Sequence, residues 1–237
     1  MSVDLYWSKN AIASIGPSGQ TNFTNAREAE EDGSNTTNTT ISNALVSGTI
    51  RSSARGGATY GFKRSYWGFD FTGYTAGTIT NLVFHYTPST SSTGTFSNRL
   101  AQFNGFGEAV GSDYTTNDWW DSIADPLVPY SNAFNSADSS TAADISLNAT
   151  AITDAKADGF LKLVLMNIGD YNNLNIAVDN NNLTNWNVGN NSTGNIFLRF
   201  DYAAPGYDNE VNAIIPASIS KVLGIVTADI SKVNGIA

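Results

Sequence analysis

The chain has 237 residues, of which 41% are hydrophobic and 11% aromatic, so it is long enough to bury one large core or two small ones. Its formal net charge is −9, with 12 Lys and Arg residues scattered among 21 Asp and Glu residues. This charge excludes nucleic acids and anionic membrane surfaces as partners, because both require a basic surface. The absence of cysteine excludes disulfides and thiolate chemistry.

The first residues, MSVDLYWSKNAIASIG, have neither the basic region nor the continuous apolar region of a secretory signal peptide. No stretch reaches the roughly 18 apolar residues that a membrane-spanning helix needs. The sequence therefore predicts a protein made in the cytoplasm without membrane insertion. Assembly into a particle released by lysis is one way in which such a protein leaves the cell.

The N-terminal part of the chain is mostly polar. The acidic segment REAEEDGSNTTNTT, residues 27–40, has no apolar period and is rich in turn formers, which predicts a solvated loop. The following segment, residues 40–53, fits either a strand or a short helix. In KRSYWGFDF, residues 63–71, every second residue from Trp67 is aromatic, which predicts a strand with one aromatic face.

Further strands follow along the chain. In TITNLVFHY, residues 78–86, the alternation places Leu82, Phe84 and Tyr86 on one face and Ile79, Val83 and His85 near the other. RLAQFNGF, residues 99–106, continues the series. FLKLVLMNI and NIFLRFDY, residues 160–168 and 195–202, are apolar on both sides and are predicted as central strands of two packed sheets. Between them, GDYNNLN and DNNNLTN, residues 169–175 and 179–185, are predicted connections.

One segment has the signals of a helix. In ISLNATAITDAKADGF, residues 145–160, Thr153 is predicted to cap a short helix and Gly159 to end it. Many strands with frequent turns elsewhere predict an all-β fold, a β-sandwich over residues 1–203 from which an N-terminal arm can extend. AAPGYDNE, residues 203–210, is a linker by composition, and residues 204–237 are predicted as a linker followed by a docking segment.

Two features of the sequence are candidates for a chemical function. His85 is the only histidine, and without a nucleophile motif beside it we interpret it as a structural or surface residue. The segment SDYTTNDWWDSIADP, residues 112–126, offers candidate glycan contacts: Trp119, Trp120, Asp118 and Asp121.

Two other interpretations of this segment stay open: tryptophan rings that are partly core, and carboxylates that hold Ca²⁺. The spacing is not that of an EF-hand loop, and we predict no metal site and no cofactor. Phosphate-binding loops are absent as well, so no catalytic residues are predicted.

The end of the sequence repeats a short cassette. ASISKVLGI, residues 217–225, is followed by ADISKVNGI, residues 228–236, at a spacing of eleven. Each cassette fits a short helix, which Asp229 and Lys232 favour through the helix dipole, or a hairpin that turns at LG and NG. Either structure is marginal alone, so its apolar side chains must be buried against the sandwich or a neighbouring subunit. The predicted docking residues are Ile219, Val222, Leu223, Ile225, Ile230, Val233 and Ile236.

These cassettes resemble the C-terminal repeats of structural proteins of tailed bacteriophages. The segment YWGFDFTGYTAGTITNLVFHYTP, residues 66–88, resembles the strand pattern of jelly-roll modules found on virions and in carbohydrate-binding proteins. The resemblance implies a jelly-roll-like sandwich in a non-enzymatic virion protein, such as a capsid decoration, head fibre or tail component. It also implies a homo-oligomer that contacts other virion proteins. A carbohydrate-binding module or adhesin for host-surface glycans is the alternative, and a glycan-active enzyme is a third hypothesis.

Overall fold

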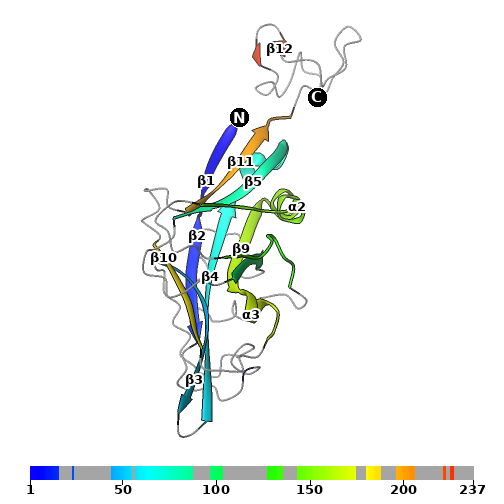
Figure 1. Cartoon of the computed structure of the whole chain (residues 1–237). Helices are drawn as coiled ribbons and strands as arrows, with labels where there is room; N and C mark the ends of the chain where they lie inside the picture. The colour runs from blue at the N-terminus through cyan, green and yellow to red at the C-terminus, as the bar shows by residue number, and fades with distance from the viewer. Residues whose placement is uncertain are drawn as a thin grey trace.

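The computed structural model describes residues 1–15, 23, 44–54, 57–87, 97–103, 127–135, 143–174, 180–187, 196–205, 221–222 and 225–226 (Figure 1). Within these ranges the chain is mostly β-strand, arranged in two main antiparallel sheets with few helices. The predicted all-β class is confirmed for this part of the chain. No helix in it is long and apolar enough to cross a membrane.

The smaller sheet, sheet A, has four strands in the order β1-β11-β5-β8. Its strands are β1 (Ser2–Tyr6), β11 (Ile196–Ala203), β5 (Thr78–Tyr86) and β8 (Ala143–Ser146). The N-terminal amino group donates a hydrogen bond of 2.7 Å to the carbonyl oxygen of Tyr202. β1 and β11, the first and last strands of the two main sheets, are thus neighbours. β11 lies between β1 and β5, so the prediction that residues 195–202 form a central strand is confirmed.

The larger sheet, sheet B, follows the order β10-β3-β4-β9-β6-β7, with β2 also paired to β4. Its strands are β2 (Lys9–Ile15), β3 (Ala44–Ala54), β4 (Gly57–Asp70), β6 (Ser97–Gln102), β7 (Phe134–Asn135), β9 (Phe160–Asn167) and β10 (Asn180–Asn187). The undecided segment 40–53 is therefore largely strand. The connection predicted at 179–185 is wrong, because β10 begins at Asn180 and pairs with β3 along its whole length.

Strand β4 is long because two strands share one of its edges. β3 pairs with residues 57–63 of β4 and β9 pairs with residues 65–70. β2 lies on the opposite edge, since its partners, residues 62–68, overlap both sets. We call β3, β10 and residues 57–63 of β4 the arm. Figure 1 shows β3 and the first part of β4 extending beyond the rest of the sheet.

Two apolar clusters lie on the two faces of sheet B. The first packs Trp67, Phe69 and the leucines of β9 against the inner face of sheet A, where Phe84 and Leu198 are fully buried. The second lies on the other face of sheet B and includes Phe62 and Tyr66. β9 is buried on both sides, as its sequence predicted. The two sheets thus pack in a sandwich-like arrangement.

A β-bulge breaks the predicted alternation in β5. The register shifts so that Asn81 and Leu82 together face the single residue Phe200, and Asn81 adopts a positive φ of 53°. Asparagine tolerates this left-handed conformation better than most residues. As a result Ile79 is buried in the first cluster with Leu82, and its predicted position on the opposite face is wrong.

Helix α2 (Ala149–Asp158) covers one end of the first cluster with two small buried side chains, Ala151 and Ala155. Its cap is Asn148, whose side chain accepts from the Ala151 amide at 3.1 Å. The predicted cap, Thr153, is wrong, because it lies inside the helix and its hydroxyl donates to the Ala149 carbonyl. Gly159 ends the helix at φ 66°, as predicted. A 3₁₀ turn, η1 (Thr72–Tyr74), and a short helix, α3 (Ile168–Tyr171), also belong to this part of the chain.

Candidate functional site

The first C-terminal cassette contains a small sheet of its own. β12 (Lys221–Val222) and β13 (Ile225–Val226) pair antiparallel, with Lys221 opposite Val226 and Val222 opposite Ile225. This register leaves two residues between the strands, as the hairpin alternative requires. The helical alternative, which the sequence favoured, is wrong for these four residues. A short connection favours a hairpin because it fixes how the two strands pair. A helix of this length is unstable alone, and the charges at its ends add too little to stabilise it.

Among the residues that the structure describes, this two-stranded sheet shares no strand pairing with sheets A and B. Figure 1 shows β12 lying apart from β1, β5 and β11, beyond the end of sheet A. A hairpin without further contacts is at best marginally stable in water. The predicted docking residues Val222 and Ile225 form its directly opposed pair, whereas the other five lie outside the described residues: Ile219, Leu223, Ile230, Val233 and Ile236.

The predicted glycan contacts also lie outside the described residues: Asp118, Trp119, Trp120 and Asp121. The ends of their segment are described, however. Phe103 belongs to the second apolar cluster, and Leu127 packs against the same cluster. The segment that carries the tryptophan pair thus leaves and rejoins the body at the outer face of sheet B, and its role in glycan binding stays a prediction.

The outer face of sheet A carries a row of aromatic and charged side chains that the sequence did not reveal. The register places Tyr6, Phe197, His85 and Asp144 side by side on four neighbouring strands. The His85 ring stacks on the Phe197 ring with centroids 4.2 Å apart. The Tyr6 ring, on the strand at the other side of β11, also packs against Phe197, with centroids 5.6 Å apart. His85 Nδ1 lies 2.5 Å from a carboxylate oxygen of Asp144. His85 is thus a surface residue with a specific partner.

A second row on this face holds an ion pair. The Arg199 guanidinium donates two hydrogen bonds to the Asp4 carboxylate, at 2.7 and 3.1 Å, and lies 5.0 Å from the centroid of the Phe197 ring. The hydrogen bond from Arg199 lowers the pKa of Asp4, and the same bond raises the pKa of Arg199. Both side chains are more than one third exposed, so solvent screens the pair.

Acidic side chains predominate among the described residues on the outer face of sheet A. Asp201 is a third exposed carboxylate on it and accepts a hydrogen bond of 2.7 Å from the side chain of Asn81. The described acidic groups on this face are the carboxylates of Asp4, Asp144 and Asp201. The described basic side chains there are the guanidinium of Arg199 and the imidazole of His85. Tyr6 adds an aromatic ring that is 42% exposed. This surface suits contacts with cations and with hydrogen-bond donors.

A buried polar clasp holds α3 against sheet B at the base of the arm. Arg64 of β4 and Asp170 of α3 form two hydrogen bonds, at 2.6 and 2.7 Å, and both side chains are essentially inaccessible to water. Burial by itself lowers the pKa of Arg64, but the Asp170 carboxylate outweighs this effect and raises it. Beside them, the Arg99 guanidinium lies 4.5 Å from the centroid of the Tyr171 ring. Because the ion pair is enclosed, we assign it a structural role.

Within the described ranges, no three or more acidic or histidine side chains come together as metal ligands. No protein-family model matches the chain, and no curated protein matches its sequence. The candidate sites are therefore defined by geometry alone. They are the separate β12–β13 sheet and the outer face of sheet A.

Proposed function

We propose that this chain is a non-enzymatic structural protein of a virion. In this proposal a jelly-roll-like body presents a polar surface, and the repeated segment 217–236 docks the body onto other copies or onto other virion proteins. The observation that supports the proposal is the β12–β13 sheet, which in the described part of the chain pairs with neither main sheet.

A sheet this small must be stabilised from outside. Each fully buried valine or isoleucine contributes about 1.5–3 kcal/mol, and a pair of two-residue strands has too few residues to bury such side chains within itself. The sequence supplies an aliphatic residue at nearly every matching position of the second cassette, so that two similar docking units follow one another. A partner surface that covers both would supply the missing burial.

The body is consistent with a structural role. Its main sheets enclose a large aromatic core, and its first and last strands pair directly, so that the ends of the body lie at one edge. The resemblance to phage proteins supplies the virion setting, in which a capsid decoration, a head fibre and a tail component all fit the arrangement.

The assembly part of the proposal is tested by comparing the full chain with a version that ends at Ala203. We expect the full chain to assemble and the shortened one to be a folded monomer, measured by light scattering after size-exclusion chromatography. Val222→Asp should also reduce assembly, because it places a charge in the docking unit, whereas Thr227→Asp, outside the paired strands, serves as the control. Equal masses for the full and shortened chains would contradict the proposal.

The virion setting needs a separate measurement. Phage particles purified from the lysate that contains this protein should carry its peptides in constant proportion to the major capsid protein, through a density gradient. Recovery of the protein only in the particle-free fraction would contradict a place on the virion.

A further inference from the structure

We propose that β1 of one copy accepts β12 of another copy as an added strand, so that sheet A continues into the C-terminal segment of its neighbour. The inference rests on the function proposed above and names the surface on which the C-terminal segment docks. It follows from the direction of the backbone groups in β1 and from the side chains beside them.

Every second residue of β1 directs its backbone amide and carbonyl away from β11. The Met1 amino group donates to the Tyr202 carbonyl oxygen at 2.7 Å, and the Tyr202 amide donates to the Met1 carbonyl oxygen at 2.8 Å. Hydrogen-bonded and non-bonded pairs alternate along an antiparallel ladder, so Val3 and Leu5 also bond to β11. The residues whose backbone groups point the other way are Ser2, Asp4 and Tyr6.

This edge of β1 has no partner strand in the described part of the chain, where β1 pairs with β11 alone. Figure 1 shows β1 at one side of sheet A, followed by β11 and β5. Natural edge strands are commonly protected from further pairing by proline, lysine or a bulge. β1 has no proline or lysine, and its register with β11 is unbroken. The edge is therefore suited to the addition of a strand.

β1 also leaves apolar surface open on both of its faces. On the inner face, Val3 and Leu5 pack against the first apolar cluster but are only partly buried. On the outer face, the Tyr6 side chain is 42% exposed. A strand added at this edge places its own side chains beside these on both faces. The contact would therefore combine backbone hydrogen bonds with the burial of apolar surface.

β12 has an edge and a sequence that match β1. In the described part of the chain it pairs with β13 on one side, which leaves its other side for a second strand. Neighbouring residues of a strand face opposite sides of the sheet, so an added β12 brings Lys221 to one face and Val222 to the other. With Lys221 on the outer face, its charge lies beside the Asp4 carboxylate, and Val222 faces the inner, apolar side. The second cassette repeats this Lys-Val pair at residues 232–233.

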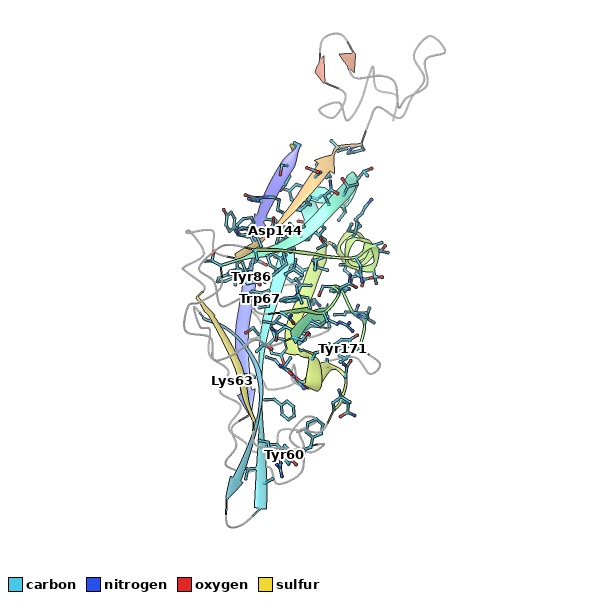
Figure 2. The ribbon with its side chains drawn as sticks, in the orientation of Figure 1. Tyr60, Lys63, Trp67, Tyr86, Asp144 and Tyr171 are labelled. Carbon is cyan, nitrogen blue, oxygen red and sulfur yellow. The ribbon has the colours of Figure 1, made fainter. Side chains whose placement is uncertain are left out.

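Two other pairings of the edges of sheet A fit less well. Two β1 strands that overlap fully would place Asp4 of one copy opposite Asp4 of the other, and like charges directly opposite destabilise a sheet. β8, which carries Asp144 in Figure 2, lies at the other edge of sheet A and has only four residues. A bridge between Ser131 and Leu147, directly after β8, covers part of that edge.

The contact is assigned to a different copy because of where β12 lies in the single chain. Residues 204–220 connect β11 to β12. An extended segment of this length spans roughly 50 Å, which is enough to reach β1 of the same chain. β12 nevertheless lies apart from β1 in Figure 1. A second copy, free in solution, can present β12 to the edge in either direction.

Asp4→Pro in the full chain tests the backbone contact. It removes an amide that points to the open edge and keeps the hydrogen bonds to β11, so the body should stay folded. Asp4→Ala is the matched control, because it removes the same carboxylate and keeps the amide. In sedimentation velocity the proline variant should associate about tenfold more weakly than the alanine variant. Equal association of the two variants would overturn the inference.

Disulfide cross-linking gives a second measurement that does not depend on the stability of the proline variant. The chain contains no cysteine, so an introduced cysteine has no partner within its own copy. Asp4→Cys in one full chain and Lys221→Cys in another should form a mixed disulfide on mild oxidation, identified by mass spectrometry of the linked peptides. Ser146→Cys, exposed on the outer face at β8, is the control and should give at least about tenfold less mixed product with Lys221→Cys. Equal yields from the two mixtures, or no mixed product from either, would overturn the inference.

Three further outcomes separate this inference from the proposed function. Loss of assembly on removal of residues 204–237, without the mixed disulfide and with no effect of Asp4→Pro, would keep the function and overturn the docking surface. Association that survives this removal but is lost in Asp4→Pro would assign the edge to a different strand and overturn both. A monomeric chain with both cysteines that links Asp4→Cys to Lys221→Cys within itself would place the segment on its own copy, which also overturns both.

Discussion

Substitution of Asp170 by asparagine should destabilise the fold by about 3–5 kcal/mol, which is the usual cost of leaving one charge of a buried ion pair without its partner. The burial and hydrogen bonding of this ion pair are reasons to expect a loss of stability of that size. The Arg64 and Asp170 side chains are only 2% and 0% exposed, and two short hydrogen bonds join them. An asparagine at this position could keep one of these bonds but not the charge. Since a domain of this kind is stabilised by roughly 5–15 kcal/mol, the variant should be close to unfolding.

Urea denaturation followed by tryptophan fluorescence measures the effect. For a loss of this size the midpoint should fall by about 1–2 M with an unchanged slope. Asp70→Asn is the matched control, because Asp70 is exposed and accepts hydrogen bonds from Thr72 that an asparagine can also accept. Its midpoint should change little, within the roughly 0.5 kcal/mol typical of surface substitutions.

The double variant Arg64→Met/Asp170→Leu completes the test. Replacement of a buried ion pair by apolar residues of similar volume is often neutral or stabilising, so it should recover most of the lost stability. A drop below about 0.5 M for Asp170→Asn, or a double variant less stable than Asp170→Asn, would refute the reasoning that the desolvated charge dominates.

Three further predictions concern other parts of the chain. Burial and a hydrogen bond to a carboxylate of α2 raise the pKa of Tyr130, so its stabilising effect is present below the unfolded pKa of about 10 and is lost as pH rises above it. Tyr130→Phe should therefore weaken the alkaline fall of the urea midpoint. Gly77→Ala should lower the melting temperature, at a cost of about 1–3 kcal/mol or more, since its Cβ would lie 2.4 Å from the Ala203 carbonyl oxygen. If the tryptophan segment binds host glycans, Trp119→Ala or Trp120→Ala should abolish glycan-array binding without changing the melting temperature.

Much of the fold follows from local patterns in the sequence. The alternation of Trp67 and Phe69 and the two-sided apolar runs of β9 and β11 predicted strands that the structure contains. Gly159 ended its helix as predicted because few other residues adopt a positive φ without strain. These features depend on neighbours in the sequence, so a single chain segment is enough to predict them.

The predictions that were wrong concern structure that depends on residues far away in the sequence. The bulge at Asn81 exists because β11 has one residue fewer than β5 at that point, and no pattern within residues 78–86 shows this. β10 is built largely from asparagine, which is rare in strands, and its pairing with β3 overrides that preference. Tertiary context decided both cases.

The candidate sites could be predicted only in part for the same reason. The cassettes are visible because they repeat, and the sequence offered the hairpin as one of two structures. The row of Tyr6, Phe197, His85 and Asp144 is invisible in the sequence, because its members come from four strands whose order is set by the whole fold. A signal was present in the single histidine, but its carboxylate partner lies 59 residues away.

The position of the clasp gives the buried ion pair a consequence beyond stability. Arg64 stands where β4 passes from β3 to β9, between the arm and the part of sheet B that faces sheet A. Two hydrogen bonds give an ion pair a defined geometry, so we expect this pair to fix the direction of the strand more strictly than an apolar pair of equal volume would. Arg64→Met/Asp170→Leu removes one positive and one negative charge, so it leaves the net charge of the chain unchanged. If the clasp sets the direction of the arm, this variant should recover most of the stability that Asp170→Asn loses in urea and yet associate more weakly than the parent in sedimentation velocity. Parental association would show that the clasp serves the fold alone.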